Sequence, residues 1–178
     1  LFGDIAPIET TKPAYPSAQP WTLLERLDRE RQLVGMYLSA HPLDPYKLEL
    51  EYGCNTRMTD LKNRENLIGK ELTFGGIVTD FRELIGKGGK PFGFLKIEDY
   101  SGSEELPLFG KDYVNFRNFG TKGSFNYVKA TCQTSAYNES RIEIKINSIE
   151  FLEDLKGKLL RSITIRMPLD KVKKGYMS

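Results

Sequence analysis

The stretch from Gly86 to Phe109 carries the two-residue period of a β-strand. Between Phe92 and Asp99, aliphatic residues and a glycine occupy one side of the predicted strand. The other side carries Phe92, Phe94, Lys96 and Glu98. An aliphatic inner face is ordinary for a strand on a core, whereas two phenylalanines beside a lysine on the outer face are less common. The pattern predicts a sheet with one core face and a second face whose aromatic rings need a partner.

Four further stretches have strand patterns, at residues 71–81, 104–109, 125–132 and 142–146. In the first, the alternation shifts by one at Gly75-Gly76, which predicts a bulge that bends the strand. Pro107 indicates an edge or rim position for its strand, and residues 111–119 predict a short helix. Five strands, a bent first strand and a helix between the third and fourth are the topology of a mainly β, five-stranded OB-fold barrel.

A helical segment precedes the strands. Thr22-Leu23-Leu24-Glu25 fits a capping box, and apolar residues then recur at helical spacing as far as Leu38. His41-Pro42 is predicted to end this helix, and residues 59–65 to form a short helix or turn.

We expect four segments along the chain. Residues 1–20 contain four prolines and form an extended arm. Residues 21–66 form the helical segment and residues 67–153 the OB-fold barrel. Residues 154–178 form a linker and the truncated start of a following domain, because 160–167 has a strand pattern. The first residue is Leu1 rather than methionine, so we expect a piece of a longer protein.

The charge and the cysteine content of the chain limit which ligands and partners it is expected to bind. The net charge is +2, and residues 67–150 hold 11 basic and 11 acidic side chains. This neutrality argues against charge-dominated binding of duplex DNA and leaves room for a weak single-strand groove. With one histidine, His41, and two cysteines without a CxxC partner, we expect no metal site, no cofactor and reduced cysteines. No apolar run reaches membrane-spanning length, so we expect no membrane partner, and the reduced cysteines indicate a cytoplasmic protein.

The outer face of the predicted sheet suits single-stranded nucleic acid, because aromatic rings stack on bases and lysines contact phosphates. The candidate DNA-binding residues are Arg82, Lys87, Lys90, Phe92, Phe94, Lys96, Tyr127 and Lys129. The alternative is that another protein element covers the phenylalanines. We expect no catalytic residues, because the adjacent pairs Glu98-Asp99 and Glu104-Glu105 point to opposite faces and cannot share two metal ions. Asp99 is interpreted as a carboxylate that caps a turn.

Two parts of the sequence resemble one family. The text ERLDRERQLVGMYLSAHPLDPY, Glu25 to Tyr46, resembles the segment before the OB domain of bacterial DNA polymerase III alpha subunits. Residues 72–99, with LPLF at 106–109, resemble that OB domain. The barrel also resembles the anticodon-binding barrel of class II aminoacyl-tRNA synthetases, in which the upstream helix has no place. The resemblance implies the C-terminal region of a DNA-directed DNA polymerase, a nucleotidyltransferase, with the OB domain near the single-stranded template.

The same resemblance implies partners. These are the single-stranded DNA template, the rest of the polymerase chain, the sliding clamp and the clamp-loader tau subunit. Leu1 and Phe2 match the last two residues of the family's clamp-binding peptide, although the glutamine that opens that motif is absent. Three functions stay open at this point: a single-strand DNA-binding module, a protein-docking module of the replisome, and a tRNA-binding barrel.

Overall fold

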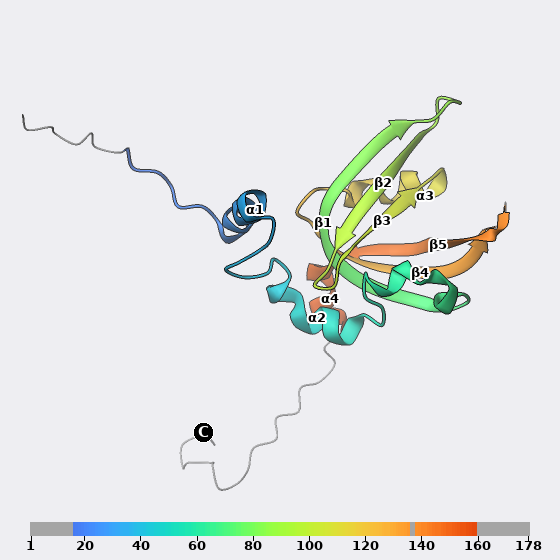
Figure 1. Ribbon diagram of the computed structural model, residues 1–178, viewed down its shortest axis with the longest axis horizontal. Helices are drawn as coiled ribbons and strands as arrows, with labels where there is room; N and C mark the ends of the chain where they lie inside the picture. The colour runs from blue at the N-terminus through green and yellow to red at the C-terminus, as the bar shows by residue number, and fades with distance from the viewer. Residues whose placement is uncertain (1–15, 136–137, 160–178) are drawn as a thin grey trace, which may run out of the picture. The chain divides into compact units, whose positions relative to one another are not determined.

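A computed structural model describes residues 16–135 and 138–159 (Figure 1). The chain divides into two compact units, Leu1–Ala40 and His41–Ser178. The predictions for Leu1 and Phe2, for most of the proline-rich arm and for the segment after residue 159 lie outside the described residues. Within the described ranges, no helix is long and apolar enough to cross a membrane.

The first unit contains α1 (Leu23–Val34), which begins with the predicted capping box. The Thr22 hydroxyl accepts the Glu25 N–H at 3.3 Å, and the Glu25 carboxylate accepts the Thr22 N–H at 2.8 Å. The predicted end at His41-Pro42 is wrong, since α1 stops at Gly35, whose φ of 87° is left-handed. Glycine adopts this conformation without a Cβ clash, and its N–H bonds to the Arg31 carbonyl at 2.8 Å.

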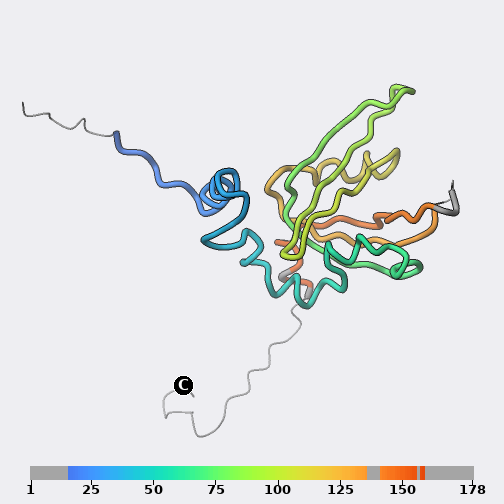
Figure 2. Tube along the Cα trace, in the orientation of Figure 1, coloured from blue at the N-terminus to red at the C-terminus, as the bar shows by residue number. Residues whose placement is uncertain are grey.

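The second unit is built on one antiparallel sheet of five strands in the order β3-β2-β1-β4-β5. The strands are β1 (Glu71–Ile85), β2 (Pro91–Glu98), β3 (Ser103–Leu108), β4 (Phe125–Ser135) and β5 (Asn138–Phe151). The first part of β1 pairs with β4 and its second part with β2, so the long strand curves between two hairpins (Figure 2). The predicted fold class is confirmed, although the sheet does not close: in the described part, β3 and β5 are its edges. Pro107 lies on edge strand β3, as predicted.

The bulge in β1 lies elsewhere than predicted. Pairing of β1 with β4 runs without a shift through Gly75 and Gly76, and the register shift falls between Val78 and Asp80. Gly76 has a different purpose: a Cβ there would lie 2.3 Å from the Glu98 carbonyl oxygen. The glycine therefore lets β2 approach β1 closely where the long strand curves.

Short helices precede and follow the strands. They are η1 (Asp44–Tyr46), α2 (Lys47–Gly53), η2 (Asp60–Lys62), η3 (Arg64–Leu67), α3 (Lys111–Phe116), η4 (Arg117–Phe119) and α4 (Leu152–Leu159). The predicted helix at 111–119 is confirmed as α3 and η4, and the helix or turn at 59–65 as η2 and η3. α4 occupies the first part of the expected linker, and it packs near α2 below the sheet (Figure 1).

Two apolar clusters hold this unit together. The inner cluster contains the fully buried Phe74, Leu95 and Ile97, and also Leu106 and Leu108 from β3. The second cluster lies on the other side of the sheet. It consists of Leu43, Tyr46, Ile77, Tyr127, Leu152 and Leu155, with Leu50, Cys54 and Phe125 packed against it. The segments around α2 and α4 therefore cover the outer side of β4 and of the first part of β1.

Arg64 connects the two edge strands. Its guanidinium forms an ion pair with Glu104 on β3 and donates to the Ile142 carbonyl on β5 at 3.5 Å. A side chain thus bridges β3 and β5, which share no backbone pairing in the described ranges.

Candidate nucleic-acid interface

The second part of β1, with β2 and β3, presents a surface that α2 and α4 do not cover. We call it the outer face, and the strand register defines it as Asp80, Arg82, Leu84, Phe92, Phe94, Lys96, Glu105 and Pro107. Directly paired residues project to the same side of a sheet. Phe94 lies between Arg82 and Pro107, in the middle row. The row on one side is apolar and contains Leu84 and Phe92. The row on the other side is charged and contains Asp80, Lys96 and Glu105.

Three phenylalanines form an aromatic cluster at the apolar end of this face. The ring centroids of Phe92 and Phe94 are 5.7 Å apart, and Phe109 lies 5.5 Å from Phe92 and 6.3 Å from Phe94. Phe92 and Phe94 are half-buried, whereas Phe109 is 54% exposed. The sequence interpretation missed Phe109 as a site residue. Its signal was available, because it lies two positions after Pro107 and thus on the same side of the extended chain.

Arg82 lies against the aromatic cluster. Its guanidinium carbon lies 5.5 Å from the centroid of the Phe94 ring, within cation–π range. The same guanidinium forms an ion pair with Glu105, and its Nε lies 3.7 Å from the Asp80 carboxylate. Lys96, one row away, forms no ion pair with any described residue. The face therefore combines rings, cations and acids within three rows.

Lys87 and Lys90 lie in the turn that joins β1 to β2. The Gly89 N–H donates to the Gly86 carbonyl at 2.9 Å, and the Gly86 N–H donates to the Lys90 carbonyl at 2.9 Å. Gly89 has a φ of 72°, which the tight turn requires and glycine supplies. Both lysines are exposed, so their charges border the apolar end of the outer face.

Tyr127 and Lys129 do not join this face. Tyr127 is 4% exposed, lies in the second cluster and donates its hydroxyl to the Gly53 carbonyl at 2.9 Å. Burial raises the pKa of Tyr127 and leaves no free ring surface for a base. Lys129 lies next to it, with Nζ 3.6 Å from Glu150 and 5.8 Å from the Tyr127 ring centroid. The structure thus brings together six of the eight predicted DNA-binding residues.

The acidic residues near the outer face have structural partners. Asp99 accepts N–H groups from Met58 at 3.0 Å, Ser101 at 2.7 Å and Gly102 at 3.0 Å, which confirms its interpretation as a turn cap. Glu104 pairs with Arg64 and Glu105 with Arg82, from opposite sides of β3. In the described ranges, no group of three or more His, Cys, Asp or Glu side chains could hold a metal ion.

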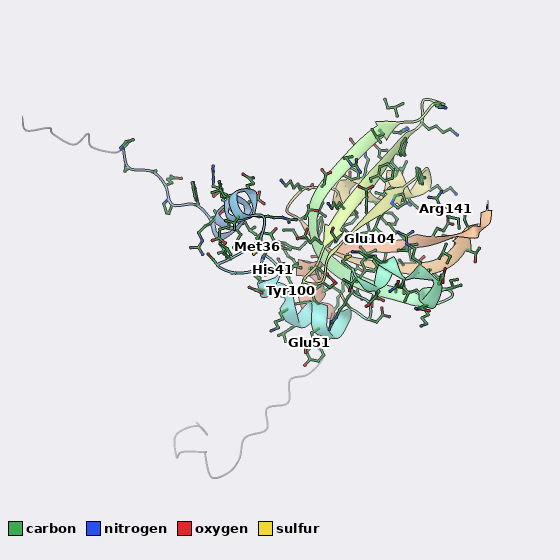
Figure 3. The ribbon with its side chains drawn as sticks, in the orientation of Figure 1. Met36, His41, Glu51, Tyr100, Glu104 and Arg141 are labelled. Carbon is green, nitrogen blue, oxygen red and sulfur yellow. The ribbon has the colours of Figure 1, made fainter. Side chains whose placement is uncertain are left out.

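The turn between β2 and β3 is fixed to the segment before α2. Tyr100 donates its hydroxyl to the Asp44 carboxylate at 2.9 Å, and the His41 ring lies 4.3 Å from the Tyr100 ring (Figure 3). The His41 N–H, and then the Tyr100 hydroxyl, lower the pKa of Asp44 by hydrogen bonding to its charged form. These bonds hold the far end of β2 and β3 in place.

A cavity of about 730 Å³ lies beside this turn, and its lining includes Lys47, Cys54, Arg57 and Tyr100. Burial, with a smaller contribution from the charge of Asp99, raises the pKa of Cys54 to about 12. The thiolate is the reactive form of cysteine, so Cys54 is a structural thiol at neutral pH.

Comparison with known proteins agrees with this architecture. Residues 72–152 match a family model described as an OB-fold nucleic acid binding domain. DNA polymerase III subunit alpha of Haemophilus influenzae is 28% identical over 170 residues, which cover 94% of this chain and 14% of that protein. The corresponding subunit of Escherichia coli strain K12 is 36% identical over 111 residues, 61% of this chain and 9% of that protein.

Among solved structures, the mitochondrial single-stranded DNA binding protein Rim1 of S. cerevisiae is 16% identical, with a TM-score of 0.35 over 47% of this chain and 94% of that chain. The chain spans only 14% of the length of the Haemophilus subunit. The resemblance predicted from the sequence is confirmed: the chain is a relative of the bacterial DNA polymerase III alpha subunits and corresponds to an OB-fold nucleic-acid-binding region of these proteins.

Proposed function

We propose that this chain is a non-catalytic module of a bacterial replicative DNA polymerase and that it binds the single-stranded template. The observation that carries the proposal is the cluster of Phe92, Phe94 and Phe109 on the outer face of an OB-fold sheet. Every base has a π-face, so stacked rings bind single strands with little sequence preference. Duplex DNA hides these faces in its own stack and should bind less well.

The composition of the face indicates weak binding. Each stacked base contributes about 1–3 kcal/mol, and the cluster has room for only a few. Arg82, Lys87 and Lys90 can contact phosphates, and each contact on a single strand adds about 0.7 to the slope of log K against log salt. We therefore expect a slope of roughly 2, well below that of charge-dominated DNA-binding proteins.

Fluorescence anisotropy of the 178-residue chain with labelled oligo-dT, a duplex of equal length and tRNA tests the proposal. We expect oligo-dT to bind most tightly. Replacement of Lys87 and Lys90 together by alanine should lower the salt slope by about 1.4, because two phosphate contacts are lost. The matched control replaces the exposed Lys122 and Lys145, which lie off the outer face, and should leave the slope unchanged. Equal affinity for duplex and single strand contradicts the proposal, and preference for tRNA favours an anticodon-binding barrel.

A second candidate is protein docking, and the acidic residues on the outer face favour it. Asp80 and Glu105 repel phosphate, while Leu84 at 45% and Phe109 at 54% exposure offer apolar contact area. Aromatic residues are enriched at the centres of protein interfaces. Absence of oligo-dT binding up to near-millimolar protein would favour this function over the first.

The proposal extends to the parent protein through its relatives. We infer a DNA-directed DNA polymerase, with the remainder of that chain, the sliding clamp and the clamp-loader tau subunit as partners. Support for this step comes from the similarity to polymerase subunits.

A further inference from the structure

The Arg82 guanidinium already contacts side chains of the protein itself. Arg82 reaches across β2 to pair with Glu105 on edge strand β3, and its Nε lies 3.7 Å from the Asp80 carboxylate on its own strand. Its guanidinium also lies 5.5 Å from the centroid of the Phe94 ring. The Glu105 carboxylate occupies a donor direction that a phosphate oxygen would otherwise use, because guanidinium pairs with carboxylate and phosphate through the same planar fork, and Asp80 adds a second negative charge nearby.

The register explains why these groups meet. Arg82 is paired with Phe94, and the next row along β2 places Lys96 beside both Asp80 and Glu105. The two acids therefore mark one end of the aromatic cluster, while the turn lysines Lys87 and Lys90 border the other. The turn lysines therefore attract the phosphates of a bound strand, whereas Asp80 and Glu105 repel them.

We propose that Glu105, assisted by Asp80, is an acidic gate that holds Arg82 over Phe94 and limits the affinity of the outer face for single strands. Binding transfers Arg82 from the Glu105 carboxylate to a phosphate of the strand. The same movement uncovers the Phe94 ring for a base. This inference rests on the proposed single-strand-binding function. It assigns a regulatory role to Asp80 and Glu105, two acidic residues that do not themselves bind the strand.

The experiment measures oligo-dT affinity by anisotropy for Glu105→Gln, Arg82→Ala and the double variant. Glutamine keeps the size of the side chain and removes its charge. An exposed ion pair shifts an equilibrium by about 1.5-fold to 5-fold, so Glu105→Gln should tighten binding by that factor. Glu71→Gln is the control for net charge, since the exposed Glu71 lies at the start of β1, outside the outer face. Melting temperatures of all variants check that each is folded.

The Arg82→Ala background separates a gate from simple repulsion. If Glu105 acts through Arg82, removing the Glu105 charge produces no gain in that background. If Glu105 repels the strand directly, the gain persists or grows, because its charge is then unpaired, and the gate is overturned. Equal affinity of Glu105→Gln and the unchanged chain overturns the gate alone. No binding of oligo-dT by any variant overturns the proposed function and the gate together.

Discussion

Phe94→Ala is the substitution that best separates a binding role from a core role. Phe94 lies mid-strand on the outer face and is half-buried, with two ring neighbours and one guanidinium. Aromatic pairs contribute about 0.5–1.5 kcal/mol each beyond their buried area. Because the space left by the ring opens to solvent, we expect a loss of only about 1–2 kcal/mol of folding free energy, at the low end of that sum.

Binding should respond more strongly than stability. If Phe94 stacks on a base, its loss removes about 1–3 kcal/mol of binding free energy, which is roughly a 5-fold to 150-fold weaker affinity for oligo-dT. The melting temperature should fall by about 3–8 °C. Thermal unfolding by circular dichroism and anisotropy on the same preparation measure both quantities.

Phe74→Ala provides the contrast. Phe74 is fully buried in the inner cluster, where the surrounding side chains cannot fill the space that the ring leaves. Its replacement by alanine should therefore lower the free energy of unfolding by about 3–5 kcal/mol. If Phe94→Ala lowers stability as much as Phe74→Ala, Phe94 is a core residue. If it leaves oligo-dT affinity unchanged, the ring is not a stacking platform. Either result refutes the reasoning.

Two further predictions concern stability. Gly76→Ala should destabilise the chain by about 1–3 kcal/mol in urea unfolding, because its Cβ would lie 2.3 Å from the Glu98 carbonyl oxygen, whereas Gly88→Ala, with nothing within 4 Å, should be near neutral. Burial raises the pKa of the Cys54 thiol and of the Tyr46 hydroxyl to about 12, with Glu153 as the second cause for Tyr46. Because these pKa values are higher in the folded state, the unfolded state loses its protons first as the pH rises. The contribution to stability is therefore fully present below the unfolded-state pKa, near 8.5 for cysteine and 10 for tyrosine, and it is lost as the pH rises toward about 12. Tyr46→Phe should therefore reduce the alkaline loss of unfolding free energy by at most about 1.4 kcal/mol per pH unit, and an unchanged slope would contradict the burial argument.

The strands could be predicted from the sequence because their signal is local. Alternation in β2 places Leu95 and Ile97 in the core, and both are fully buried. The helix end was also encoded locally, by Gly35, but His41-Pro42 looked like the stronger stop signal. A left-handed glycine ends a helix with a hydrogen bond of its own, so no later proline is needed.

The position of the bulge could not be predicted in the same way. Gly75-Gly76 looks like a bulge in the strand pattern, yet glycine also serves where two backbones approach closely. Which purpose applies depends on Glu98, a residue of another strand that lies against Gly76 only in the folded sheet.

The candidate site shows the same division between local and long-range information. Phe94 and Tyr127 both occur in strands with aromatic and basic neighbours, and the sequence alone treats them alike. Their surroundings differ because β1 curves: its second part carries the outer face, whereas its first part and β4 lie under the second cluster. The helices that cover Tyr127 come from before β1 and after β5, so only tertiary contacts decide that Phe94 keeps a ring available and Tyr127 does not. A single-strand path along this chain should therefore run over β2 and β3 from the lysine-bearing turn, and end at the row of Asp80 and Glu105.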